Sequence, residues 1–281
     1  MAALPNARPF YDRFRLAVEA GFEGVEVEVS QGPAAEIREA ADRAGMVVHS
    51  VHCAANYRHP LSSGDPATRA AGVTATLAAI EAARVLGADT MLLIPGKVDD
   101  DASYGDVYAR SQQVIRRDIL PAAEQYGIVL GIENVWNGFL LSPIDFARYV
   151  EAFDSPFVRA YLDVGNIVFG RPEGWIDILG PLIAKLHLKD FRFDADRGRF
   201  GIARIGEGTI DWCRVRAALE RIGFSGWAVL AEAERAQGPI ARRVFHRLRR
   251  ASPNPAVRAA QTYLSRRLLA DVIARFRRHI A

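Results

Sequence analysis

The stretch YLDVGNIVFG places a carboxylate, Asp163, inside an apolar run. A carboxylate at the end of a buried strand has lost its water and needs a hydrogen-bond donor, an arginine or a metal ion as its partner. Three other stretches repeat the pattern of a polar side chain after apolar residues: GIEN with Glu133, KLHLKD with His187 and VLAEAE with Glu232. The sequence therefore offers three carboxylates and one imidazole at equivalent positions of successive apolar runs.

A divalent metal ion would explain why these side chains recur together. If the four runs are neighbouring strands, their ends converge, and three carboxylates without a cation would repel one another and raise each other's pKa. Each residue alone has an ordinary explanation, as an ion-paired carboxylate or a hydrogen-bonded core histidine, but four such residues on successive runs favour a site. Oxygen donors with one imidazole suit Mn²⁺, Co²⁺, Zn²⁺ or Mg²⁺, and we expect one ion, with Mn²⁺ as the first candidate.

Short β-branched runs alternate with amphipathic helical stretches along the chain, which is typical of βα units around a parallel sheet. The seven predicted strands are EGVEVEV, VVHSVHC, DTMLLIPG, IVLGIENVW, VRAYLDVGN, IAKLHLKDF and GWAVLAEAE. The polar residues gather at strand ends, where a (β/α)₈ TIM barrel builds its active sites, and no GxGxxG motif supports an open doubly wound sheet. We therefore predict a TIM barrel whose first strand is short or missing, because only MAALPNARP precedes the first helix.

An Arg-rich segment follows the last predicted strand. From Arg235 onward there are 12 Arg and one acid, Asp271, so this segment has a net charge of +11. Because the whole chain has a net charge of +3, residues 1–234 have a net charge of −8. We expect a barrel over residues 1–234 and a helical basic extension over residues 235–281 packed on it. A solvated helix face explains this charge better than nucleic-acid binding, since no aromatic interleaving or nucleic-acid motif accompanies it.

The remaining composition excludes several classes of protein. Cys53 and Cys213 are the only cysteines and have no CxxC spacing, so neither a disulfide framework nor a cysteine metal site is indicated. No apolar run approaches the roughly 20 residues of a membrane span, and the N-terminus lacks the apolar centre of a signal peptide. We expect a cytoplasmic protein that binds neither membrane nor nucleic acid.

The motifs IENVWN, DVGN and HLKD together resemble the xylose-isomerase-like TIM barrel family of sugar and sugar-phosphate isomerases and epimerases. More narrowly, the segment 132–191 is similar to the L-ribulose-5-phosphate 3-epimerase and hexulose-6-phosphate isomerase branch, and HPLSSGDPATRAAG and LLIPGKV fit that branch. The resemblance covers roughly residues 10–235. It implies a metal ion held by Glu133, Asp163, His187 and Glu232, a sugar or sugar phosphate as substrate, and a homodimer or homotetramer. The incomplete first strand and the long basic extension depart from the family pattern.

The resemblance implies chemistry at a carbon next to a ketose carbonyl. A metal ion acts as a Lewis acid there and stabilises an enediolate, while two carboxylates handle the proton. If Glu133 and Glu232 flank the substrate, one removes the C3 proton and the other returns a proton from the opposite face, which epimerises that carbon. An aldose–ketose isomerase would instead move the proton on one face with a single Glu.

Several further residues are candidates for holding the substrate. Asn134, Trp136 and Asn166 lie beside the predicted ligands and can bind hydroxyls or stack on a sugar, and His52 can donate to a hydroxyl. A phosphate needs cations or backbone donors, for which Lys189, Arg192 and the turn IGEGTIDW are candidates. Ordinary surface charge explains the two cations equally well.

Two other functions remain open at this point, and a third is disfavoured. The same metal and paired acids serve elimination, so a lyase of the keto-inositol dehydratase or C-glycoside-cleaving type is an alternative. A DNA-repair endonuclease on this barrel needs more histidines than the six in this chain. The incomplete first strand and the basic extension would also fit a non-catalytic barrel.

Overall fold

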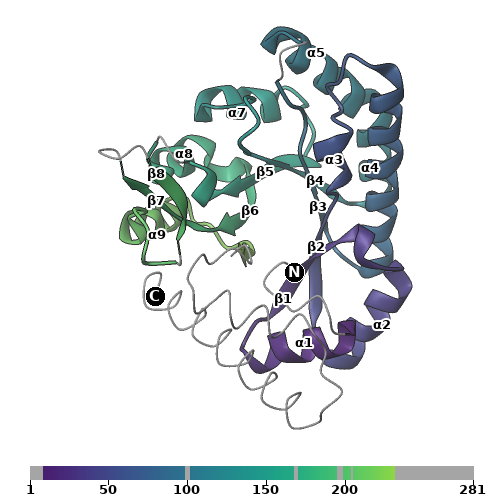
Figure 1. Cartoon of the computed structure of the whole chain (residues 1–281), viewed down its shortest axis with the longest axis vertical. Helices are drawn as coiled ribbons and strands as arrows, with labels where there is room; N and C mark the ends of the chain where they lie inside the picture. The colour runs from purple at the N-terminus through teal and green to yellow at the C-terminus, as the bar shows by residue number, and fades with distance from the viewer. Residues whose placement is uncertain (1–8, 99–101, 168–169, 195–198, 204, 232–281) are drawn as a thin grey trace.

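A computed structural model of the chain describes residues 9–98, 102–167, 170–194, 199–203 and 205–231. Its centre is a sheet of seven parallel strands in the spatial order β1-β2-β3-β4-β5-β6-β9, curved into a ring with helices outside it (Figure 1). The strands are β1 Gly24–Glu28, β2 Val47–His52, β3 Thr90–Leu93, β4 Val129–Glu133, β5 Val158–Asp163, β6 Ile183–Leu188 and β9 Ala228–Leu230. Each of the seven predicted runs contains one of them, so the predicted TIM barrel is confirmed.

The helices cover the outer face of this ring and bury their apolar stripes against it. Those in the described part of the chain are α1 Phe10–Glu19, α2 Ala34–Ala44, α3 Ala55–Arg58, α4 Pro66–Leu86, α5 Tyr104–Val114, α6 Leu120–Tyr126, α7 Pro143–Glu151, α8 Pro172–Leu179 and α9 Trp212–Arg221. Asp65 begins α4 by accepting hydrogen bonds from the backbone N–H groups of Ala67 and Thr68. Gly87 ends it with a positive φ of 71°, a conformation that glycine adopts without steric cost.

The Trp227 side chain lies at the joint between β1 and β9, the first and last described strands of the sheet. In the described residues no backbone pairing joins β9 to β1. Instead Trp227, just before β9, stacks on His49 of β2 with ring centroids 4.5 Å apart, and a Cβ on Gly24 of β1 would lie 2.9 Å from the indole. The backbone carbonyl of His49 accepts a hydrogen bond of 2.6 Å from Lys185 Nζ on β6, which fixes this layer across the barrel.

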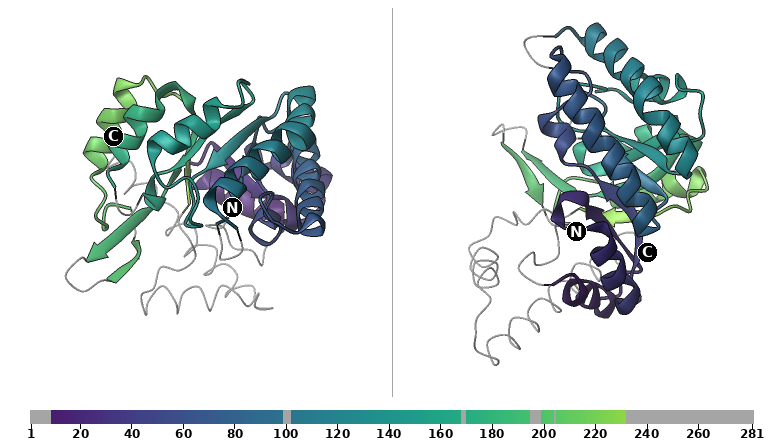
Figure 2. Two further views of the ribbon diagram at one scale, coloured as in Figure 1. Left: turned by 90° about the horizontal axis from the view of Figure 1, so that it is seen from above. Right: turned by 90° about the vertical axis from the view of Figure 1, so that its right-hand side faces the viewer.

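A two-stranded antiparallel hairpin, β7 Asp190–Asp194 and β8 Arg199–Ala203, projects from the ring on its β6 side (Figure 2). The sequence reasoning had continued the sixth strand to Phe191 and had not foreseen the hairpin. The sixth strand in fact ends at Leu188. From Asp190 onward the chain pairs with β8 in the antiparallel direction.

The described residues include no helix that is both long and apolar enough to cross a membrane. The predicted basic extension, residues 235–281, and the stub preceding residue 9 lie outside the described residues, as does the predicted ligand Glu232.

Replacing Gly24 by Ala should destabilise the fold by about 1–3 kcal/mol, because the added methyl group overpacks against an indole already stacked on His49. Urea denaturation measures the change. Gly174→Ala is the matched control, since Gly174 lies in α8 with nothing within 4 Å of a new Cβ, and it should be neutral or stabilising. Equal stabilities of the two variants would contradict this account of the joint.

Candidate metal centre

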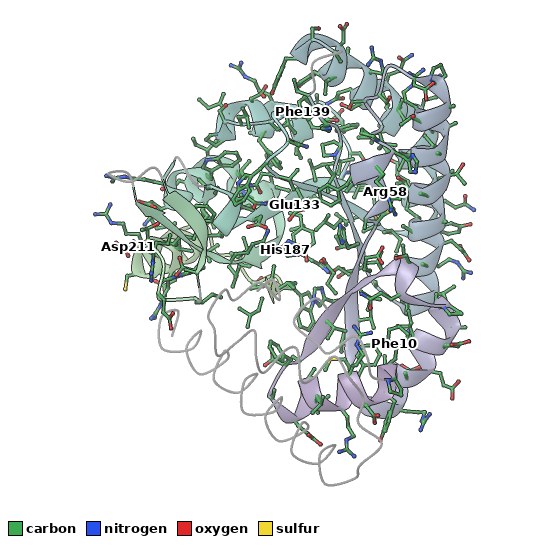
Figure 3. The ribbon with its side chains drawn as sticks, viewed as in Figure 1. Phe10, Arg58, Glu133, Phe139, His187 and Asp211 are labelled. Atoms are coloured by element: carbon green, nitrogen blue, oxygen red, sulfur yellow. The ribbon has the colours of Figure 1, made fainter. Side chains whose placement is uncertain are left out.

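Three predicted ligands meet at the carboxyl ends of three adjacent strands. Glu133 ends β4, Asp163 ends β5 and His187 lies near the end of β6, and each offers one ligand atom within 4.8 Å of the others. All three are buried, and Figure 3 shows Glu133 and His187 close together at the centre of the ring. His187 Nδ1 lies 2.8 Å from Glu133 Oε1 and 3.8 Å from Asp163 Oδ2. Parallel strands bring these ends together although the residues are far apart in the chain.

Asn134 and Asn166 hold Asp163 in position. The Asn134 side chain accepts a hydrogen bond of 2.7 Å from the Asp163 backbone N–H and donates one of 2.9 Å to the Asp163 carbonyl oxygen. The Asn166 backbone N–H donates to Asp163 Oδ1, and its side chain donates to the carbonyl oxygen of Asn134. One carboxylate oxygen of Asp163 is thereby fixed, and the other points toward His187.

That second oxygen, Asp163 Oδ2, is fully buried and accepts no aligned hydrogen bond from the described residues. Its nearest cation is Lys189 Nζ, which lies 2.5 Å away as an ion pair. Burial raises the pKa of Asp163 to about 6, the Lys189 ammonium opposes that rise and the Glu133 carboxylate adds to it. A buried carboxylate oxygen whose nearest cation is a single ammonium group can also accept a divalent cation.

His187 is held from its other side by a residue that the sequence reasoning missed. Its Nε2 lies 3.0 Å from Glu26 Oε1, and Glu26 Oε2 accepts hydrogen bonds from Ser50 (2.8 Å) and Tyr161 (2.7 Å). A histidine that ligates a metal commonly donates its second ring N–H to a carboxylate, which fixes its tautomer and orientation. Glu26 supplies that carboxylate here. The available signal was a lone acid between Val25 and Val27 of a buried strand.

The charges around His187 strongly favour its protonated form in the metal-free protein. Burial alone lowers the pKa of His187, but the carboxylates of Glu26 and Glu133 raise it to about 10. For Glu26 the effects are opposite: burial raises the pKa of Glu26, but the neighbouring His187 imidazolium holds that pKa far below its ordinary value. The imidazolium thus occupies the place of a cation among the carboxylates.

The donor set fits a divalent metal ion. Glu133, Asp163 and His187 direct two carboxylates and one imidazole nitrogen at one point, and the far side of the imidazole is anchored by Glu26. Oxygen donors with one nitrogen donor suit Mn²⁺ and the other ions named above.

Trp136 and His52 border the centre. The Trp136 indole donates a hydrogen bond of 2.9 Å to the Asn166 carbonyl oxygen, packs edge-on against Phe191 and leaves 54% of the residue exposed. His52 Nε2 is buried without a hydrogen-bond partner in the described residues. The His52 ring lies edge-on to Tyr57. Burial raises the pKa of Tyr57, and the carboxylates of Glu133, Asp163 and Glu26 raise it further. Tyr57 is therefore a neighbour of the centre that the sequence reasoning also missed.

The two cations suggested for a phosphate are engaged elsewhere. Lys189 is paired with Asp163 and lies 3.4 Å from Asn166 Oδ1, so it is part of the metal centre. The exposed Arg192 guanidinium donates a hydrogen bond of 2.5 Å to the carbonyl oxygen of Glu207.

The turn IGEGTIDW, suggested as a phosphate cradle, already holds an anion of the chain itself. The backbone N–H groups of Gly206 (2.8 Å) and Gly208 (3.1 Å) both donate to Asp190 Oδ2. The same oxygen accepts a hydrogen bond from the Trp212 indole. The phosphate interpretation of this turn is therefore corrected for these two donors: the glycines let the turn close around the Asp190 carboxylate at the base of the hairpin.

Comparison with known proteins gives the same picture of the fold. The family described as "Xylose isomerase-like TIM barrel" matches residues 14–265. L-ribulose-5-phosphate 3-epimerase UlaE of Salmonella typhimurium (strain LT2) is 25% identical over 255 residues, which are 85% of this chain and 88% of that protein.

Two solved structures share this architecture. A D-psicose 3-epimerase crystallised in the presence of D-fructose superposes with a TM-score of 0.72 at 21% identity, over 99% of this chain and 96% of that one. The 3-keto-D-glucoside 4-epimerase YcjR of E. coli in its apo form has a TM-score of 0.69 at 18% identity, over 85% and 94% of the two chains.

Replacing Glu26 by Gln should weaken Mn²⁺ binding by about 10–100-fold, the range expected when the partner of a ligating histidine is removed. Calorimetric titration of the metal-free protein measures the affinity, and Glu26→Asp should restore part of it. Glu28→Gln is the control on the same strand, because Glu28 bonds Ser30 and does not contact His187. Unchanged affinity in Glu26→Gln would show that Glu26 does not support the ligand.

Mn²⁺ affinity should rise with pH. His187 must lose its proton to ligate, and with its pKa raised to about 10 it is protonated in the metal-free protein at neutral pH, so lower pH favours the proton over the metal. Below about pH 6 protonation of Asp163 should steepen the loss. Titrations at pH 7.5 in buffers of different ionisation enthalpy should report roughly one proton released per ion. Release of no proton would contradict the protonated state assigned to His187.

Proposed function

The chain belongs to the xylose isomerase-like TIM barrel family, and from this premise we propose that it is a divalent-metal-dependent epimerase or isomerase of a ketose or ketose phosphate, acting at C3. The observation that carries the proposal is the convergence of Glu133, Asp163 and His187 at the carboxyl ends of adjacent strands. TIM-barrel enzymes place their catalytic residues at that end. The names of the relatives, an L-ribulose-5-phosphate 3-epimerase and a D-psicose 3-epimerase, support the same reaction class.

In this proposal Glu133, Asp163 and His187 hold the ion, with Glu232 as the fourth ligand. A bound divalent ion, with Mn²⁺ as the first candidate, would supply Lewis acidity to the carbonyl and hydroxyl oxygens of a ketose. Asn134 and Asn166 fix the orientation of Asp163, and its Oδ2, which pairs with Lys189 in this structure, would face the ion.

Glu133 and Glu232 carry the proton chemistry. Burial raises the pKa of Glu133, but the hydrogen bond from His187 and the positive charges of His187 and Lys189 together outweigh it and keep the pKa below its ordinary value, so the carboxylate is ionised at neutral pH. An ionised Glu133 can accept the C3 proton on one face of the substrate, and Glu232 returns a proton to the other face, which inverts C3.

Residues around the ligands bind the sugar. His52 Nε2, buried without a partner in the described part of the chain, pairs with a substrate hydroxyl, because burial of an unpaired ring nitrogen is otherwise unfavourable. The half-exposed Trp136 ring offers an apolar face for the sugar carbons. Asn134 and Asn166 contribute mainly by holding the strand ends, and Lys189 by balancing the carboxylates near the reacting atoms.

Purified protein loaded with Mn²⁺ should exchange the C3 hydrogen of D-fructose or L-ribulose 5-phosphate with solvent deuterium, as followed by NMR. Glu133→Gln should reduce the exchange rate about 10²–10⁴-fold, since it removes the group proposed as general base. Glu151→Gln at the exposed end of α7 is the matched control and should exchange normally.

The other functions predict different results in the same experiment. A lyase would bind the ion and release a dehydrated product from its substrate. A non-catalytic barrel would fold stably, show no stoichiometric binding of any divalent ion and exchange no hydrogen.

A further inference from the structure

A large pocket lies beside Asn134 and Asn166, and apart from these two residues and Trp136 its walls have no role in the chemistry proposed above. Its volume is about 730 Å³, within the range of sites that enclose drug-sized ligands, so a free pentulose or hexulose would fill only a fraction of it. Its walls include Trp136, Leu140, Leu141 and Trp175, from the β4–α7 loop and α8. No charged side chain is among the described residues that line it.

The pocket shares residues with the surroundings of the metal centre. Asn134 and Asn166 line it and also bond the backbone and carboxylate of Asp163. Trp136 forms another part of the wall and is fixed by its hydrogen bond to the carbonyl oxygen of Asn166. Two residues that position Asp163, Asn134 and Asn166, therefore also form part of the pocket wall.

The wall of the pocket is shaped before any ligand binds. Leu140 has a φ of 55°, a conformation that a branched L-residue adopts only at an energetic cost, and its backbone N–H donates to the Tyr104 hydroxyl at 3.2 Å. Tyr104 in turn donates to Asp145 on α7. Strain maintained by such contacts is typical of ligand sites.

The cations suggested for a phosphate are not among the described residues that line this pocket. Lys189 is paired with Asp163, Arg192 bonds the Glu207 carbonyl oxygen, and two N–H groups of the glycine turn bond Asp190. An anionic group in the pocket would lose water without gaining a cation from the described residues that line it. Burial there favours an uncharged apolar group.

We propose that the pocket receives an apolar, uncharged substituent of the substrate, such as an aryl or alkyl group attached to the sugar. This inference rests on the proposed function and narrows it: the preferred substrates are keto sugars that carry such a group, and small ketose phosphates are poor substrates.

Three probes share one reacting part and differ in the substituent: D-fructose, D-fructose 6-phosphate and 6-O-benzyl-D-fructose, with 1-O-benzyl-D-fructose to test the other end. Binding to the Mn²⁺-loaded protein is measured by calorimetry and C3 hydrogen exchange by NMR. At least one benzyl ether should bind at least tenfold more tightly than D-fructose, and the phosphate should gain nothing over D-fructose.

Leu141→Lys tests the pocket, with Ile144→Lys as its control. Both side chains are exposed, at 68% and 55%, and stand in neighbouring positions of the same region, but only Leu141 lines the pocket. Leu141→Lys should remove at least fivefold of the preference for the benzyl ether and improve binding of the phosphate. Ile144→Lys should change neither.

Three results would overturn the inference. A preference for the phosphate, or equal binding of all probes, would show that the pocket does not select the substituent, and hydrogen exchange on D-fructose would leave the proposed function intact. Concentration-dependent assembly that Leu141→Lys abolishes, without a benzyl preference in the unchanged protein, would assign the pocket to a second copy of the chain. Tight binding of the benzyl ether without exchange on any probe would instead preserve the pocket and contradict the proposed reaction.

Discussion

The contact of His187 with buried carboxylates on both sides is the interaction on which the rest of the barrel interior depends. Glu26, Glu133 and Asp163 are all buried in one space, where like charges repel strongly and water is excluded. The imidazole bonds Glu26 through Nε2 and Glu133 through Nδ1, so it links the first strand of the sheet to the fourth across the interior. A protein selected only for stability gains little from such a cluster, because well-packed apolar residues replace buried ion pairs at no loss. The cluster therefore supports the proposed divalent-metal site.

Around this cluster the chain divides its polar residues between two tasks. One set fixes the strand ends: Asn134 and Asn166 bridge β4 and β5, and Ser50 and Tyr161 hold Glu26. The other set faces the site: Asp163 Oδ2 pairs with Lys189, and His52 Nε2 has no hydrogen-bond partner in the described residues. Because the strand ends are fixed, the side-chain atoms that face the site are held in position as well. Binding and catalysis require this preorganisation. The apolar pocket extends this rigid edge outward through a strained loop, so that the same scaffold can hold both the reacting end of a substrate and an apolar remainder.

Much of the fold could be predicted from residue order because the signals were local. Short β-branched runs between amphipathic helical stretches predicted all seven parallel strands of the described sheet. The position of Asp163, Glu133 and His187 at strand ends was also local information, and the barrel's parallel order turned it into convergence. The hairpin at Asp190 was not foreseen, because a short run after His187 reads as one longer strand until the reversal of its partner is known. The glycine turn was misread for a related reason: its donors are visible in the sequence, but their partner Asp190 is 16 to 18 residues away.

The sequence by itself determined the parallel barrel, the ligand types and their placement at strand ends, since these follow from periodicity and from the cost of burying charge. Tertiary structure alone decided which side chains pair with one another. It paired Lys189 with Asp163, joined Glu26 to His187 over 161 positions of the chain and stacked Trp227 on His49 where backbone pairing between the outer strands is absent in the described residues. The physical reason is that a polar or aromatic side chain has several possible partners in sequence, and only the three-dimensional packing fixes the one within bonding distance.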